Sequence, residues 1–395
     1  MGKPKRKRAP PRTSRSSPIE DARNVSALVR MRLIASTAGR CEFRGCNRDL
    51  FQHPVTGTAG NFAQEAHIVA FRERGPRGSG PRPANVNAFE NLMLLCGDCH
   101  HLIDTQHAGY SVALLREHKR EHEDRIFALT ALGPEYRTTV IQLRGSIGGQ
   151  PVDIPVTDIR SALEPRYPAR LPGVLIDLTA IQRESPAFFE LARDQIRREL
   201  RPMLRTEREA KHVQHYSVFA LAPIPVLAAL GRELGNKVTV DLMQRHRDQS
   251  WRWREDGDVV GYSFSLLRRG TEATRAALQI SLSGPISASS IPSDAIDARF
   301  SLYEITLDGP EPSVDFLRRR EDLVAFRVAY RKALSKILTA HGGLTEIHVL
   351  PAVPAPIAIA LGQEVMPKAQ PALVLYDNVK GRFARAFTIN ASDEL

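Results

Sequence analysis

The four cysteines of the chain constrain its fold more than any other feature, because they form two close pairs and no further cysteine is present. The first pair is Cys41-x4-Cys46 and the second is Cys96-x2-Cys99. Two pairs with these spacings can close one tetrahedral zinc site with four sulfur ligands. A site with four sulfur ligands leaves no open position for water, so we expect this zinc to be structural.

Polar residues that can carry chemistry lie between and beside the cysteine pairs. His67 lies between them, Asn91 shortly before the second pair, and His100 directly after it. This order, interleaved with two zinc-binding pairs, resembles the HNH endonuclease family. Besides Cys41 and Cys46, the segments that carry the resemblance are Ala66-His67-Ile68, Glu90-Asn91-Leu92-Met93-Leu94-Leu95 and Cys96-Gly97-Asp98-Cys99-His100.

The resemblance implies an α+β nuclease domain with a ββα-metal arrangement that hydrolyses phosphodiesters. His67 is the candidate general base, because neutral imidazole can take a proton from water near neutral pH. His100 matches the family's ligand of a divalent cation, here Mg²⁺, which stabilises the leaving 3′ oxygen. Asn91 matches the asparagine that holds the loop between the strands and so orients the base.

One position departs from the family pattern. Many HNH enzymes carry Asp or His immediately before the base as a second metal ligand, whereas this chain has Ala66. Neighbouring side chains of a strand point to opposite faces, so Glu65 and His67 are expected to share a face. Glu65 and Asp104 are both candidates for the missing carboxylate, and a water molecule is the alternative.

The pattern around these motifs predicts a nuclease domain over residues 20–132. Residues 72–83 are rich in Arg, Gly and Pro, which predicts a loop whose arginines either grip the DNA backbone or are solvated. The expected helices cover residues 20–38, 99–105 and 111–130, and the expected strands cover residues 61–70 and 91–96.

Charge and composition favour a partner that carries phosphates. The 395 residues have a formal net charge of +11, and residues 1–19 are basic without any acidic residue. Such a tail is expected to be disordered and either to neutralise phosphates or only to aid solubility. No run of about eighteen apolar residues and no secretory signal occurs, so we expect a cytoplasmic protein without membrane contact.

Residues 133–172 are expected to link two domains. Residues 138–145 and 150–156 flank Ser-Ile-Gly-Gly, which predicts a hairpin. Closely spaced prolines in residues 161–172 predict a connector.

Residues 173–395 contain an internal repeat. Residues 223–234 align without gaps to residues 354–365, with Pro-x-Pro at both starts and Leu-Gly near both ends. Each copy lies between two apolar, strand-like runs, which predicts a strand–helix–strand unit. Two copies predict an α/β domain of two Rossmann-like halves, and chance similarity of Ala- and Leu-rich helices is the alternative.

Ligands of such folds bind beyond the carboxyl ends of the strands. The residues at these positions are candidates for a ligand site: Ser283, Gly284, Pro354 and Ala355. The segment Trp251-Arg252-Trp253 is a further candidate, since tryptophan stacks on bases and arginine pairs with phosphate. A half-buried amphipathic strand explains the same alternation, so both interpretations stay open.

This half of the chain resembles the SAVED domain, a fusion of two CARF-like halves that senses cyclic oligonucleotides. The resemblance rests on Leu282-Ser283-Gly284, Leu375-Tyr376-Asp377 and residues 348–362. An HNH nuclease fused to SAVED is similar to effectors of bacterial anti-phage CBASS systems. The resemblance implies a largely non-specific, Mg²⁺-dependent double-stranded DNA endonuclease, which a cyclic di- or trinucleotide activates by driving homo-oligomerisation.

Two other functions are compatible with the sequence. A restriction-type HNH nuclease would recognise modified DNA directly and cut without a small molecule. A non-catalytic, ligand-controlled DNA-binding regulator is favoured only by Ala66, and His67, Asn91 and His100 together argue against it.

Overall fold

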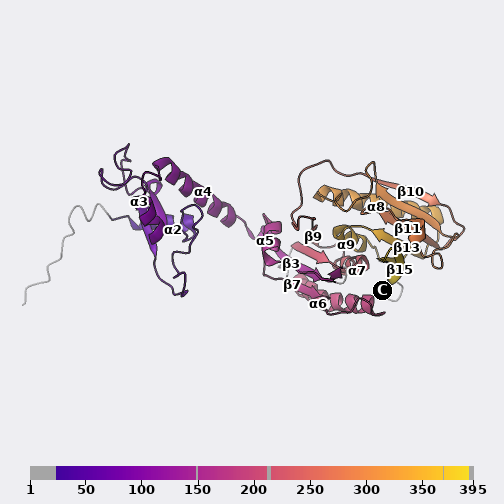
Figure 1. Ribbon diagram of the computed structural model, residues 1–395. Coiled ribbons are helices and arrows are strands. Elements are labelled where there is room, and N and C mark those ends of the chain that lie inside the picture. Colours follow the sequence, from indigo (N-terminus) through magenta and orange to yellow (C-terminus); the bar gives the residue numbers. More distant parts are fainter. Residues whose placement is uncertain (1–23, 148–149, 211–214, 368, 391–395) are drawn as a thin grey trace, which may run out of the picture. The chain divides into compact units, whose positions relative to one another are not determined.

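The computed structural model describes residues 24–147, 150–210, 215–367 and 369–390 (Figure 1). Contacts between residues divide the chain into two units, Met1–Gly133 and Pro134–Leu395. The basic tail predicted for residues 1–19 and the beginning of the helix predicted for residues 20–38 lie outside the described residues.

The first unit is built around a pair of short antiparallel strands. β1 (Ala63–His67) pairs with β2 (Leu92–Cys96), so that His67 lies opposite Leu92. Every residue of β2 is buried. The short helix η1 (Phe89–Asn91) leads into β2, and α3 (Gly97–Thr105) follows it directly. The strands therefore bring the candidate base next to the segment that carries the second cysteine pair.

Two longer helices, α2 (Ala27–Thr37) and α4 (Val112–Thr130), complete the first unit. α2 begins later than predicted because the Ser26 hydroxyl accepts a hydrogen bond from the backbone N–H of Val29 and so caps the helix there. It ends, as predicted, before Gly39, which has a positive φ. Buried apolar side chains from both helices and from β2 form one small core.

The described part of the second unit contains two large sheets and one small two-stranded sheet (Figure 1). In the first sheet all strands are parallel, with β3 paired on both sides. Its strands are β3 (Arg137–Arg144), β6 (Tyr167–Pro168), β7 (Val174–Asp177), β8 (His215–Leu221) and β9 (Thr239–Leu242). The helices of this half are η2 (Pro134–Tyr136), α5 (Val156–Leu163), α6 (Phe188–Ala210) and α7 (Ile224–Leu234).

The hairpin and connector predicted for residues 133–172 differ from this structure. β3 is a central strand whose residues from Thr138 to Leu143 are all buried. Only β4 (Ser146–Ile147) and β5 (Gln150–Pro151) form a small antiparallel pair. A strand that is covered on both faces shows no clear polar alternation, so its sequence did not distinguish it from a hairpin strand.

The second sheet has parallel strands in its centre and antiparallel strands at both edges. The spatial order is β10 (Tyr262–Arg268), β12 (Ser301–Leu307), β11 (Arg275–Ser281), β13 (Glu346–Ala352), β14 (Ala372–Val379) and β15 (Arg382–Ile389). Its helices are η3 (Ala288–Ser290), α8 (Arg320–His341) and α9 (Ala355–Gln363).

The aligned segments 223–234 and 354–365 form α7 and α9, which lie against each other (Figure 1). A Cβ added to Gly231 would lie 1.9 Å from the carbonyl oxygen of Ile359, and one added to Gly362 would lie 1.8 Å from that of Ala228. Gly231 aligns with Gly362, and Ala228 aligns with Ile359. The contact is therefore reciprocal, and only glycine permits such a close approach of the two backbones.

A second feature is the same in both halves and holds α7 and α9 to their neighbouring helices. Glu233 at the end of α7 and Glu364 at the end of α9 occupy aligned positions, and both carboxylates are mostly buried. Each carboxylate accepts hydrogen bonds from two arginines that are one turn apart on the preceding long helix. The pairs are Arg197 and Arg201 of α6, and Arg327 and Arg331 of α8.

Candidate functional site

The four cysteines come together in the first unit. Their Sγ atoms all lie within 4.8 Å of one another, and this is the only such group of three or more metal-binding side chains among the described residues. Cys96 caps α3, and its Sγ accepts a hydrogen bond from the backbone N–H of Cys99 at 3.5 Å. Cys41 Sγ accepts one from the N–H of Cys96 at 3.3 Å. The donors and their spacing fit a zinc ion.

The electrostatics of the thiols also call for a cation. Burial raises the pKa of the Cys41 thiol to about 12. Burial and the neighbouring sulfur charges raise the pKa of Cys99 as well. Burial also acts to raise the pKa of Cys96, but hydrogen bonds from Cys99 and the other thiols outweigh it and lower that pKa. Four thiolates can coexist at this distance only when a cation offsets their repulsion.

His67 ends β1 and is half-buried, with its ring 6.1 Å from that of Phe71. Its Nε2 lies 2.9 Å from the side-chain oxygen of Asn87. Because an amide oxygen can only accept, Nε2–H donates this hydrogen bond, and Nδ1 is left as the basic nitrogen. Asn87 was not predicted: it lies 20 residues from His67, and no local pattern connects the two.

Asn91 is 2% exposed and holds the loop between the strands by three hydrogen bonds. Its Oδ1 accepts from the N–H of Val69 at 2.9 Å. Its Nδ2 donates to the carbonyl oxygens of Val69 at 3.0 Å and Val86 at 2.8 Å. These contacts have the geometry of a loop anchor, which is the role expected for Asn91.

His100 lies on α3, with Nε2 3.4 Å from Oδ2 of Asp104. Burial lowers the pKa of His100; the charge of Asp104 opposes this, while His67 and Arg77 lower it further. A metal-binding histidine commonly directs its second ring nitrogen to a carboxylate. Asp104 is therefore placed to orient His100.

Glu65 shares a side of β1 with His67, while Ala66 is fully buried. The Glu65 carboxylate pairs with the Arg30 guanidinium, with Nη2 3.2 Å from Oε2. Neither Glu65 nor Asp104 belongs to a group of three possible metal ligands among the described residues. The replacement of the family's usual ligand at Ala66 by Glu65, by Asp104 or by a water molecule therefore stays a prediction.

The arginines of the loop at residues 72–83 are of two kinds. Arg72 and Arg74 are exposed. The side chains of Arg77 and Arg82 instead turn inward and donate hydrogen bonds to backbone carbonyl groups. The prediction that this loop's arginines contact DNA therefore does not extend to Arg77 and Arg82, whose guanidinium groups donate to the protein's own backbone.

The structure brings together the candidates at the carboxyl ends of β11 and β13. The N–H of Ser283 donates to the carbonyl oxygen of Ala352 at 2.7 Å, and Gly284 has open space around its Cα. Pro354 and Ala355 follow at the start of α9. These residues share one edge of the second sheet, where the position of a ligand was expected.

Trp251 and Trp253 are not placed to stack on a ligand. Trp251 is 3% and Trp253 is 8% exposed, both belong to the core, and the Trp251 ring packs edge-on against Phe219 at 5.3 Å. Arg252 points outward and pairs with Glu164. The interpretation of these rings as a stacking site is therefore wrong. Large apolar rings are buried in the core whether or not charged residues flank them.

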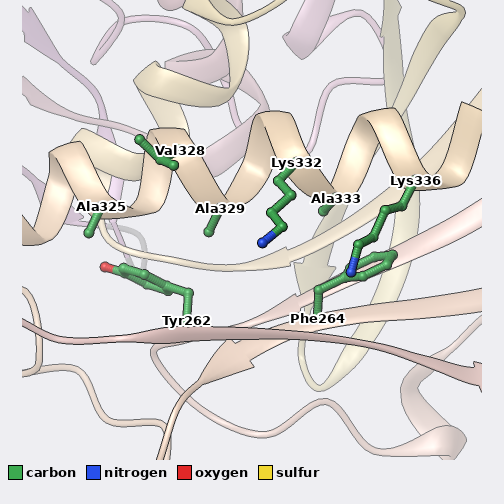
Figure 2. A pocket seen from close by; sticks show the side chains of 8 residues that line it. All are labelled: Tyr262, Phe264, Ala325, Val328, Ala329, Lys332, Ala333 and Lys336. Carbon is green, nitrogen blue, oxygen red and sulfur yellow. The ribbon is translucent and has the colours of Figure 1, made fainter.

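A separate groove of about 430 Å³ lies between α8 and the edge strand β10. Figure 2 shows Lys332 and Lys336 of α8 reaching toward the side of the groove that carries Tyr262 and Phe264. None of the predicted ligand-binding residues lines this groove.

Two parts of the chain match known families, one an endonuclease domain and the other a sensor domain. Residues 41–108 match the model of the HNH endonuclease family. Residues 196–389 match that of SAVED, the SMODS-associated and fused to various effectors sensor domain. The two matches thus place an HNH endonuclease domain in the first unit and a SAVED sensor domain in the second.

Solved structures of Cap4 SAVED/CARF-domain containing receptors are also similar. One, from Acinetobacter baumannii with the cyclic trinucleotide 3′3′3′-cAAA, is 12% identical with a TM-score of 0.45, covering 74% of this chain and 62% of that one. Another, from Moraxella osloensis, is 11% identical with a TM-score of 0.39, covering 74% of this chain and 60% of that one. The chain thus spans less than two thirds of either receptor. Among curated proteins none matches.

Within the described ranges, no helix combines the length and the apolar character that crossing a membrane requires.

Proposed function

We propose that this protein is a Mg²⁺-dependent, largely non-specific endonuclease of double-stranded DNA that a cyclic di- or trinucleotide activates. The observation that carries this proposal is that β1, η1 and α3, which carry His67, Asn91 and His100, adjoin β2 in a chain that also has a SAVED sensor domain. The setting we propose is CBASS antiviral defence in the bacterial cytoplasm.

In the proposed reaction, His67 Nδ1 takes a proton from the water that attacks phosphorus, while Asn87 holds the ring through Nε2. The bond from phosphorus to the leaving 3′ oxygen breaks as the bond to water forms. Asn91 keeps the following loop, and with it His67, in position. His100, with Glu65 or Asp104, would hold the Mg²⁺ ion, which supplies stabilisation of the developing negative charge. A zinc ion on the four cysteines would have a structural role and would fix the start of α3.

For the sensor we propose that the two sheets are two Rossmann-like, CARF-type halves. The strand orders β7-β3-β8-β9 and β12-β11-β13-β14 correspond, and both are parallel. The reciprocal contact of α7 and α9 supports this assignment. The cyclic nucleotide would bind at the strand ends that include Ser283, Gly284, Pro354 and Ala355, and binding would drive homo-oligomerisation that makes the nuclease competent.

Plasmid cleavage with Mg²⁺ across a panel of cyclic di- and trinucleotides tests this proposal. We expect cleavage with one ligand only, lost by at least about 100-fold in His67→Ala. His101→Ala is the matched control, because His101 is exposed and lies beside His100 on α3. Oligomer size is measured with and without the active nucleotide.

The other outcomes point to the alternatives. Cleavage of modified DNA without any nucleotide would identify a restriction-type nuclease. Nucleotide binding without cleavage under any condition would identify a ligand-controlled DNA-binding regulator.

A further inference from the structure

A single buried arginine connects the two elements that carry the candidate catalytic residues. The side chain of Arg77 is 5% exposed. Its Nε donates to the carbonyl oxygen of Ile68 at 2.8 Å, and its Nη2 reaches that of His67 at 3.4 Å. Its Nη1 donates to the carbonyl oxygen of Ile103 at 2.5 Å, and Nη2 also donates to Oδ1 of Asp104 at 3.1 Å.

These contacts lie at both sides of the proposed active site. The first two acceptors are at the end of β1, which carries His67, and the other two are at the end of α3, which carries His100. Asp104 also links Arg77 to His100, because its other carboxylate oxygen, Oδ2, lies 3.4 Å from His100 Nε2. One planar guanidinium thus holds the base strand and the metal-ligand helix together.

The loop is shaped to direct this side chain inward. Arg77 itself has a φ of 59°, in the left-handed region that non-glycine residues rarely adopt. The next residue, Gly78, is buried, and a Cβ there would lie 2.4 Å from the carbonyl oxygen of Arg72. Such a conformation persists only where the surrounding contacts impose it, and it is concentrated at functional sites.

We propose that Arg77 is a positioning residue that sets the separation and orientation of His67 and His100. The proposal rests on the nuclease function proposed above. With its donors engaged by the protein, Arg77 acts through the two histidines and does not contact DNA. A lysine retains the charge at this position but cannot reproduce the fork that spans both elements.

The test compares Arg77→Lys with Arg82→Lys in the ligand-activated protein. Arg82 lies in the same loop and also turns inward, but its hydrogen bonds go to the carbonyl oxygens of Phe71 and Gly78, which lie in or next to the loop and not in α3. We expect Arg77→Lys to lower kcat by about 100-fold while KM for plasmid changes by less than about threefold. Arg82→Lys should retain the wild-type kcat, and added guanidinium ion should partly restore Arg77→Ala.

A second readout separates this proposal from the nuclease function. In ¹⁵N-histidine spectra of the protein without Mg²⁺, Arg77→Lys should shift the imidazole signals of both His67 and His100, whereas Arg82→Lys should not. Unchanged signals in Arg77→Lys, an equal loss of kcat in both variants, or a rise in KM alone would each overturn the positioning role. If the wild-type protein cuts no DNA, the proposed function fails, and the spectra still decide the role of Arg77.

Discussion

The two units of the chain are stabilised in different ways. The first has a small apolar core around β2, and the sulfur atoms of Cys41 and Cys96 belong to that core. The second has an extended core that includes both sheets and the α7–α9 pair. Small cores supply little stability and commonly need a metal or a disulfide. We therefore predict that metal binding is needed to fold the nuclease unit, whereas packing alone folds the sensor unit.

Each unit offers its own reporter for testing this difference. The chain's two tryptophans, Trp251 and Trp253, are buried in the sensor unit, so tryptophan fluorescence follows the unfolding of that unit. Bound zinc and protection from proteolysis follow the nuclease unit. A perturbation that belongs to one unit should move one reporter and leave the other unchanged.

The largest effect is expected from zinc loss. Cys99→Ser, or chelation of the wild type, should unfold the nuclease unit, because zinc sites of this kind contribute about 10 kcal/mol or more to folding. The tryptophan transition should stay unchanged. Zinc content and limited proteolysis measure the result, with His101→Ala as the control that keeps zinc. A folded, protease-resistant nuclease unit without zinc would refute the comparison.

The next largest effect is expected at the α7–α9 contact. Gly231→Ala and Gly362→Ala each place a methyl group less than 2 Å from a backbone carbonyl oxygen. Each should destabilise the sensor unit by about 3 kcal/mol, because both helices must separate. Gly343→Ala is the control, since nothing lies within 4 Å of its added Cβ. Urea unfolding followed by tryptophan fluorescence measures the loss, and zinc content should not change.

The smallest effect is expected at the arginine-bound carboxylates. Burial acts to raise the pKa of Glu364, but hydrogen bonds from Arg331 and Arg327 outweigh it and hold the pKa below its usual value. Glu364→Gln should lower the free energy of unfolding by about 1–2 kcal/mol at pH 7. This is less than the loss of a fully buried ion pair costs, because Arg331 is largely exposed. Glu233→Gln at the aligned position should behave alike, since the pKa of Glu233 is lowered in the same way.

The pH dependence follows from this lowered pKa. The contribution of Glu364 is fully present above the unfolded value of about 4.3 and is lost as pH falls through the lower folded pKa. The difference between wild type and Glu364→Gln should therefore shrink below about pH 4.3. Glu164→Gln removes an exposed partner of Arg252 and should change stability by less than about 0.5 kcal/mol at any pH. Equal effects of Glu364→Gln and Glu164→Gln would contradict the assigned role of burial.

Local sequence predicted much of the nuclease unit. The helix end at Gly39 and the strands that carry His67 and Cys96 lie where residue patterns placed them. The sensor unit was predicted less well. The pattern of β3 predicts a hairpin strand, because a strand buried on both faces shows no clear polar alternation. The pattern around Trp251 and Trp253 leaves ligand contact and burial both open, because a ring in a core and a ring at an interface look alike in sequence.

The sequence by itself determined the cysteine spacing, the order of His67, Asn91 and His100, and the repeat around Gly231 and Gly362. Those features depend on residue type and short separations along the chain. Tertiary structure alone decided that Asn87 holds His67, that Arg77 joins β1 to α3, and that aligned glycines face each other's backbones. Such contacts depend on which surfaces the fold brings together, and they cannot be predicted from the order of residues along the chain.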